Sequence, residues 1–233
     1  MLRSALACLA LCSAVLGSTA ARACDIALVL ALDVSASIDA REYRLQQDGL
    51  AGALTDPAVA DAVAARGGIW LTAFEWSGSR HQYEQLPWTF VRGADDLARA
   101  AGTFRSAARR VDEFPTSLGY ALGHALNLLK EAPEACDRQV IDVSGDGVNN
   151  DGFPPESAYL AHDMSLITVN GLVIMDDDPT VVQYYLQSVI QGAGSFVQPT
   201  NSYNDYEEAM RRKLLRELGA FSFVRLDLPA FDR

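Results

Sequence analysis

The feature of this sequence that most restricts its fold is the regular alternation of short apolar runs with segments of helical periodicity. Residues 26–32 read Ile-Ala-Leu-Val-Leu-Ala-Leu, an unbroken apolar run typical of a strand buried on both faces of a sheet. Residues 39–54 then place apolar side chains at helical spacing behind Asp39, a residue suited to an N-cap. Strands that alternate with helices form parallel sheets covered on both faces. The sequence therefore predicts a doubly wound α/β fold.

The same alternation continues along the rest of the chain. Further strands are expected at 68–74, 81–90, 139–144, 166–175 and 195–198, with 166–175 interrupted at Asn170-Gly171. Further helices are expected at 94–109, 117–130, 155–163, 179–190 and 205–218. The strand at 81–90 is more polar and contains Pro87, which places it at an edge. Together these elements predict a mostly parallel central sheet of about six strands with one antiparallel edge.

Residues 1–23 have the features of an export signal. Arg3 supplies a positive charge, a short apolar segment follows, and Ala21-Arg22-Ala23 matches an A-x-A cleavage site. The apolar segment is too short to span a bilayer, and no later segment approaches that length. Lipidation of Cys24 is the less favoured alternative, because position 21 is not a large aliphatic residue. We therefore expect one mature domain over residues 24–233, exported to the periplasm or the extracellular space.

Charge and cysteine content narrow the class of partner and the compartment. The chain has a formal net charge of −11, which argues against nucleic acid and anionic membrane surfaces as partners.

Outside residues 1–23 only Cys24 and Cys136 remain, lying nine residues before Asp33 and ten before Asp146. If both aspartates end neighbouring parallel strands, both cysteines lie together at the opposite ends. We expect a disulfide, and two free thiols are the alternative.

Three separate segments offer oxygen-bearing side chains at predicted strand or helix ends. Asp33, Ser35 and Ser37 form a DxSxS motif directly after the first strand, Thr116 precedes a helix, and Asp146 ends a buried strand between two glycines. Right-handed crossovers bring the carboxyl ends of parallel strands to one edge of the sheet. Carboxylates and hydroxyls are the hard donors that Mg²⁺, Mn²⁺ or Ca²⁺ prefers. The alternative for the motif is simple capping of the next helix.

These segments together resemble the metal-ion-dependent adhesion site of von Willebrand A domains. Ala-Phe-Glu-Trp-Ser at 73–77 and Val-Ile-Asp-Val-Ser-Gly-Asp-Gly at 140–147 are similar to an exported bacterial branch recorded as a domain of unknown function. The resemblance implies metal ligation by Asp33, Ser35, Ser37, Thr116 and Asp146, with Mg²⁺ as the first choice of ion. It also implies that a protein or peptide partner supplies a carboxylate to the ion. One departure is Pro115, where relatives usually have glycine.

Several other polar residues invite a functional or a structural interpretation. Glu75, Trp76 and Asp176 are expected to rim the metal face, where they either shape partner choice or solvate loop tips. Asp142 lies inside an apolar strand and is either a support for the site or a satisfied core carboxylate. Residues 149–152, Asn-Asn-Asp-Gly, break the spacing of a calcium loop and favour Asx turns. The basic residues of the last predicted helix are expected to form a solvated face: Arg211, Arg212, Lys213 and Arg216.

Two other functions compete with metal-dependent binding. A metal-assisted hydrolase needs a general base or a second metal beside the first, and Glu75 is the one candidate that the pattern places nearby. The sequence has no Gly-x-Ser-x-Gly elbow and no His-Glu-x-x-His motif. A scaffold in which the ion only stabilises loops is the third possibility. The sequence favours a binding module without catalytic residues.

Overall fold

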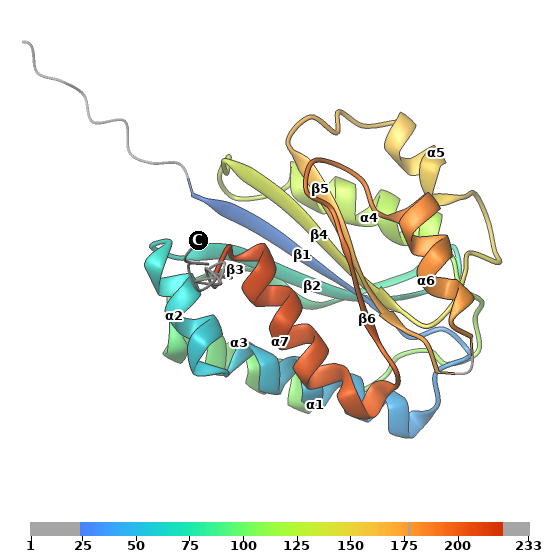
Figure 1. The fold of residues 1–233 in the computed structure, drawn as a ribbon, viewed down its shortest axis with the longest axis horizontal. Coiled ribbons are helices and arrows are strands. Elements are labelled where there is room, and N and C mark those ends of the chain that lie inside the picture. Colours follow the sequence, from blue (N-terminus) through green and yellow to red (C-terminus); the bar gives the residue numbers. More distant parts are fainter. Residues whose placement is uncertain (1–23, 177, 221–233) are drawn as a thin grey trace, which may run out of the picture.

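The computed structural model describes residues 24–176 and 178–220, and these residues form a three-layer α/β arrangement (Figure 1). Within them, one sheet has the strand order β3-β2-β1-β4-β5-β6. All neighbouring strands pair in parallel except β2 and β3, which are antiparallel. The strands are β1 Ile26–Asp33, β2 Ile69–Ser77, β3 His81–Val91, β4 Arg138–Gly145, β5 Ile167–Ile174 and β6 Val197–Thr200. The predicted fold class, with its antiparallel edge, is confirmed.

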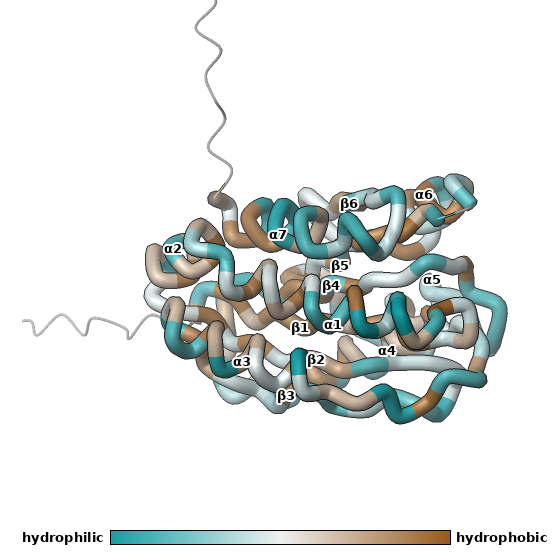
Figure 2. Tube along the Cα trace, turned by 90° about the horizontal axis from the view of Figure 1, so that it is seen from below, coloured by the Kyte–Doolittle hydropathy of each residue, from teal (hydrophilic) through white to brown (hydrophobic). Residues whose placement is uncertain are grey.

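Helices cover both faces of this sheet, as Figure 1 shows. One face carries α1 Ala40–Leu54, α2 Pro57–Ala65, α3 Ala94–Ser106 and α7 Tyr206–Glu217. The other face carries α4 Leu118–Lys130, α5 Pro155–Leu160 and α6 Thr180–Tyr184, which continues as a π-helix over Tyr185–Val189. A 3₁₀ turn at Tyr203–Asp205 precedes α7. In Figure 2, α1 and α7 each alternate hydrophilic and hydrophobic stretches, as helices with one buried face do.

Strand β1 separates the two hydrophobic cores. Its even-numbered residues, such as Leu28 and Leu30, pack in the core under α1 and α7. Its odd-numbered residues, such as Val29 and Ala31, pack in the core under α4. Alternation of side chains along a strand therefore places the side chain of Asp33 on the α4 side, at the carboxyl end of the strand.

The local signals at helix starts were partly visible in the sequence. Asp39 caps α1 as expected, and Glu42 completes a capping box by accepting from the Asp39 amide. Helix α2 was not predicted, although Asp56 caps it and Pro57 occupies its first position. The structure also corrects several boundaries: the helix at 94–109 ends at residue 106, the helix at 155–163 ends at 160, and the last strand shifts to 197–200.

The predicted interruption of β5 at Asn170-Gly171 is wrong, because β5 runs unbroken through both residues. Asn170 is buried, donates to Glu217 Oε1 at 2.8 Å and accepts from the Phe196 amide at 3.1 Å. Gly171 lies under the ring of Tyr185, where any larger side chain would collide. Both residues therefore suit a continuous strand: Asn170 makes buried hydrogen bonds, and Gly171 leaves room for the Tyr185 ring.

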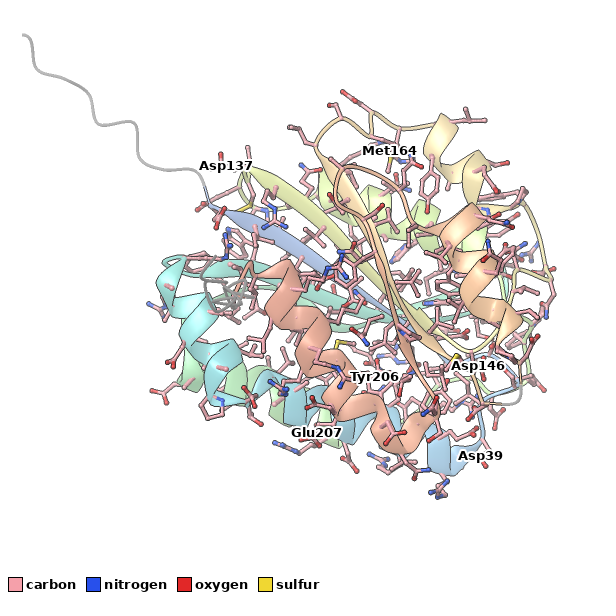
Figure 3. The ribbon with its side chains drawn as sticks, viewed as in Figure 1. Asp39, Asp137, Asp146, Met164, Tyr206 and Glu207 are labelled. Carbon is pink, nitrogen blue, oxygen red and sulfur yellow. A yellow bond between two sulfur atoms is a disulfide. The ribbon has the colours of Figure 1, made fainter. Side chains whose placement is uncertain are left out.

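Cys24 and Cys136 form the predicted disulfide, with their Cα atoms 4.5 Å apart at a sequence separation of 112. The bridge joins the amino ends of β1 and β4, where the Asp137 amide also donates to the Cys24 carbonyl at 3.0 Å. In Figure 3, Asp137 and Asp146 mark opposite ends of the sheet. The disulfide thus fixes the end of the sheet remote from the predicted metal residues.

We expect Cys136→Ser to lower the free energy of unfolding by about 2–5 kcal/mol, because the bridge closes a long loop in the unfolded chain. Denaturant unfolding of the variant and of the oxidised and reduced wild-type chain measures this. The reduced wild-type chain should match the variant, and alkylation of Cys24 should require prior reduction. Equal stability of all three would contradict the prediction.

The last helix contains a buried ion cluster where a solvated basic face was predicted. Lys213 is fully buried, and its Nζ lies 2.6 Å from Asp142 Oδ1 and 2.7 Å from Glu217 Oε1. Arg211 and Arg212 behave as expected and pair with the half-exposed Glu208 on the surface. The expectation is therefore wrong for Lys213. Asp142 is a core carboxylate that pairs with Lys213 of α7, and in the described part of the chain no hydrogen bond or ion pair joins it to the predicted metal residues.

Burial raises the pKa of Asp142 to about 7, although the Lys213 ammonium lowers it in part. An unfolded aspartate titrates near 3.9, so the folded chain binds this proton more tightly than the unfolded chain. The contribution of Asp142 to stability is therefore present at low pH and declines as pH rises from about 4 to about 7, with a slope of at most about 1.4 kcal/mol per pH unit. Urea unfolding at several pH values should show this decline, and Asp142→Asn should remove that component. Parallel pH profiles for the two chains would contradict it.

Candidate metal site

The loop after β1 folds its three predicted ligands toward one point. The Ser35 amide donates to Asp33 Oδ1 at 2.8 Å, and the Ile38 amide donates to the Ser35 carbonyl at 3.0 Å. These bonds turn the chain sharply, so that the Oγ atoms of Ser35 and Ser37 lie 3.3 Å apart. A carboxylate and two hydroxyls therefore converge at the carboxyl end of β1.

The other two predicted ligands reach the same point from distant parts of the chain. Asp146 follows β4, which pairs directly with β1, and its Oδ1 accepts from Ser37 Oγ at 2.8 Å. Thr116 lies in the loop before α4, and its Oγ1 donates to Ser35 Oγ at 3.2 Å. Figure 3 places Asp146 at the end of β4. The structure thus brings together all five residues that the sequence singled out.

The electrostatics of this cluster fit a cation. Asp33 is fully buried, and its Oδ2 has no hydrogen-bond partner among residues 24–176 and 178–220. Burial and the negative charge of Asp146 raise the pKa of Asp33 well above its usual range. Burial also raises the pKa of Asp146, and the negative charges of Asp176 and Glu42 raise it further. Two crowded carboxylates with an unpaired buried oxygen are unfavourable until a positive charge is added.

The donor set also indicates the kind of ion. In the part of the chain that the structure describes, no group of three or more His, Cys, Asp or Glu side chains has a metal-binding arrangement. The cluster has two carboxylates and three hydroxyls, so an ion here would depend on serine and threonine oxygens. Such all-oxygen sets suit Mg²⁺, Mn²⁺ or Ca²⁺. With few anionic ligands, a bound ion would keep positive charge available for an outside group.

Arg109 holds the DxSxS loop in place, a role that the sequence analysis missed. Its guanidinium donates to the carbonyls of Ile38 at 2.7 Å, Val34 at 2.9 Å and Ser35 at 3.0 Å. Its positive charge also counteracts the raised pKa of Asp33. Residue 109 was assigned to a helix, but α3 ends at Ser106, which frees Arg109 to cross to this loop.

Residues 149–151 position Thr116 and the start of α4. Asn150 Oδ1 accepts from the Thr116 amide at 2.9 Å, and the Asn150 amide donates to the Thr116 carbonyl at 2.9 Å. Asp151 accepts from Ser117 Oγ at 2.6 Å, and Asn149 accepts from the Gly119 amide at 3.2 Å. These side chains are therefore used in loop contacts. They hold Thr116 toward Ser35 even though Pro115 precedes it.

The structure corrects two of the three predicted rim residues. Glu75 and Trp76 are 1% and 0% exposed, because β2 continues to Ser77 and keeps both inside the fold. Glu75 accepts from the Arg110 amide at 3.1 Å and from Gln85 Nε2 at 2.9 Å, and burial raises its pKa. Asp176 is exposed beyond the end of β5 and close enough to Asp146 to affect its pKa. Only Asp176 is therefore placed to rim the site.

A family model described as "Protein of unknown function (DUF1194)" matches residues 23–222. No curated protein matches the chain. Within the described chain, no helix is both long and apolar enough to cross a membrane.

Several solved structures share the fold. A von Willebrand factor type A structure from Catenulispora acidiphila is 14% identical with a TM-score of 0.59, and the match covers 84% of this chain and 43% of that one. Proximal thread matrix protein 1 from the mussel byssus is 16% identical with a TM-score of 0.62, and the match covers 84% of this chain and 49% of that one. A second structure of it, with a zinc-occupied MIDAS motif, is 17% identical with a TM-score of 0.62 and coverages of 84% and 48%. The pilus adhesin SpaC from Lactobacillus rhamnosus GG is 14% identical with a TM-score of 0.60 and coverages of 84% and 31%. The chain thus corresponds to less than half of each of these proteins.

Proposed function

The chain belongs to the family described as protein of unknown function (DUF1194) and has a von Willebrand A-type fold, and from this premise we propose that it is an exported, metal-dependent binding module. Asp33, Ser35, Ser37, Thr116 and Asp146 hold one divalent cation, Mg²⁺ first and Mn²⁺ or Ca²⁺ as alternatives. The ion in turn binds a carboxylate of a protein or peptide partner.

The observation that carries this proposal is the meeting of five oxygen-bearing side chains at one point, among them the buried Asp33 carboxylate. Ser37 bonds to Asp146 at 2.8 Å and Thr116 bonds to Ser35 at 3.2 Å, so three distant segments already share one point. An orphaned Asp33 Oδ2 supports the need for a positive charge there. The zinc-occupied MIDAS of the mussel protein shows that a fold of this kind can hold a divalent ion, and the pilus adhesin shows the fold in a protein named for adhesion.

The negative charge of the chain makes the proposed ion necessary for binding a carboxylate. With a formal net charge of −11, the surface repels an acidic partner at long range. A carboxylate that nevertheless binds needs a concentrated positive charge, which a divalent ion at the loop edge supplies. The ion would therefore be essential for capture, and the surrounding acids would select a partner with basic residues beside its carboxylate.

The disulfide supports export, because such bridges persist outside the reducing cytoplasm. We propose that residues 1–23, which lie outside the described residues, are the removed signal and that 24–233 is the mature domain. A hydrolase would need a general base beside the ion, and Glu75 is the candidate that the sequence suggested. Its carboxylate already accepts hydrogen bonds from Arg110 and Gln85 within the fold. No observation therefore favours catalysis over binding.

Affinity capture from a cell-envelope extract tests this function. The purified, immobilised chain should retain a specific protein in Mg²⁺ buffer and release it in chelator. A Ser37→Ala/Asp146→Asn chain serves as the matched control and should retain nothing above background. Capture that is equal in chelator would overturn the adhesion mechanism, and a bound ion without any captured protein would favour the scaffold role instead.

A further inference from the structure

Close to the five residues of the proposed metal site lies a buried tyrosine, Tyr185, whose hydroxyl has had no role in the site so far. Tyr185 is fully buried, and its hydroxyl has no hydrogen-bond partner among the residues that the structure describes. The same is true of Asp33 Oδ2, which is the unpaired oxygen of the proposed metal site. Buried polar atoms normally have partners, so each of these two unpaired atoms requires an explanation.

Two glycines on adjacent strands allow the Tyr185 ring to reach this region. A Cβ on Gly171 of β5 would lie 2.6 Å from Tyr185 Cδ1, so only glycine lets the ring lie flat on that strand. A Cβ on Gly145 of β4 would lie 2.8 Å from the Tyr185 hydroxyl and 2.8 Å from Asp33 Oδ2. The ring therefore crosses from β5 to β4, and its hydroxyl ends beside the Asp33 carboxylate.

The geometry of the two oxygens suits a bridging water. Both lie 2.8 Å from the same point beside Gly145, so they are at most twice that distance apart. Neither oxygen has a hydrogen-bond partner among the described residues, so they do not bond directly to each other, and a gap of this size is within reach of one water molecule that hydrogen-bonds to both. Burial, with the charges of Asp33 and Asp146, raises the pKa of Tyr185 well above its usual range, so the hydroxyl keeps its proton and remains a donor.

The backbone at this position is also unusual. Tyr185 begins the π-helix Tyr185–Val189 that follows α6, and such wide turns are frequent at functional sites. The wider turn places Tyr185 in the core under α4, on the same side of the sheet as the Asp33 side chain.

We propose that Tyr185 is a positioning residue for the metal site, whose hydroxyl fixes the buried Asp33 Oδ2 through one water molecule. This inference rests on the proposed function. It adds a residue from the β5–β6 connection to a site otherwise built from the β1, β4 and α4 loops. Groups that orient ligands in this way commonly change metal affinity by about 10- to 100-fold.

The test is Tyr185→Phe, with Tyr206→Phe as the matched control. Tyr206 is also a buried tyrosine, but it donates to Ser144 Oγ at 3.2 Å and belongs to the opposite core (Figure 3). Calorimetric titration with Mg²⁺ should give a dissociation constant about 10-fold higher for Tyr185→Phe and unchanged for Tyr206→Phe. Without metal, the thermal midpoint of Tyr185→Phe should equal that of the wild-type chain. Mg²⁺ should change the tyrosine absorbance of the wild-type chain, because the ion alters the charge beside the Tyr185 hydroxyl, and this change should be lost in Tyr185→Phe.

Each outcome bears on a different claim. An unchanged dissociation constant in Tyr185→Phe, with normal Mg²⁺ binding by the wild-type chain, would overturn the role of Tyr185 alone. Equal weakening in both variants, or a lower metal-free midpoint that explains the loss, would show a general packing effect and also overturn it. A wild-type chain that binds no Mg²⁺ would overturn the proposed function and this inference with it.

Discussion

We expect Asp146→Asn to weaken Mg²⁺ binding by about 100-fold and to abolish metal-dependent capture of the partner, because one of only two carboxylates in the cluster loses its charge. The substitution keeps the size of the side chain and an oxygen for Ser37 to bond. Loss of a carboxylate whose pKa burial raises should leave the metal-free fold as stable as before or slightly more stable. Calorimetric titration with Mg²⁺ and thermal unfolding in chelator measure the two effects separately.

Asp48→Asn is the matched control, since Asp48 lies exposed on α1 and contacts none of the five cluster residues by any hydrogen bond in the structure's described part. This variant changes the net charge by the same amount as Asp146→Asn. It should bind Mg²⁺ like the wild-type chain, which separates a local effect from a general change in charge. If both variants bound Mg²⁺ equally well, Asp146 would have no role in the site.

The second large effect concerns stability. We expect Lys213→Met to lower the free energy of unfolding by about 3–5 kcal/mol, because it leaves Asp142 and Glu217 buried without their shared cation. That loss is a large part of the 5–15 kcal/mol typical of a folded domain. Urea unfolding followed by circular dichroism measures it, and the metal-free chain is used so that ion binding does not contribute.

Two further chains make this prediction specific. Arg212→Met on the same helix removes a partly exposed surface pair with Glu208 and should cost less than about 1 kcal/mol. A triple variant that also carries Asp142→Leu and Glu217→Gln should recover much of the loss, because it leaves no unpaired buried charge and keeps an oxygen at position 217 for Asn170. A Lys213→Met chain as stable as Arg212→Met would show that the buried cluster contributes little.

The position of the site was predictable because it depends on strand ends. Asp33 follows an unbroken apolar run and Asp146 follows a strand whose buried part, residues 140–145, is apolar apart from Asp142 and Ser144, and parallel pairing of β1 with β4 puts those ends side by side. The disulfide was predictable for the same reason, since Cys24 and Cys136 lie at matching distances from those ends. The spacing of residues along the sequence is therefore enough to predict which residues meet, wherever the order of the strands alone decides which segments are neighbours.

The features that the sequence did not predict depend on contacts between helices, strands and loops, and the periodicity of the sequence does not reveal such contacts. Glu75 and Trp76 were expected on a loop because the apolar run seemed to end at Phe74, but antiparallel pairing with β3 extends β2 to Ser77. Lys213 was expected in solvent because basic residues flank it, and only the packing of α7 over β4 shows that Asp142 faces it. The role of Arg109 required knowing where α3 ends. In each case a tertiary contact decided the outcome.

The measurement that tests the central claim most directly is calorimetric titration of the chelator-stripped chain with Mg²⁺, repeated with Mn²⁺ and Ca²⁺. Convergence of Asp33, Ser35, Ser37, Thr116 and Asp146 predicts binding at one site, with a matching rise in the thermal midpoint. Absence of both heat and thermal shift with all three ions would contradict a metal-binding role for this cluster.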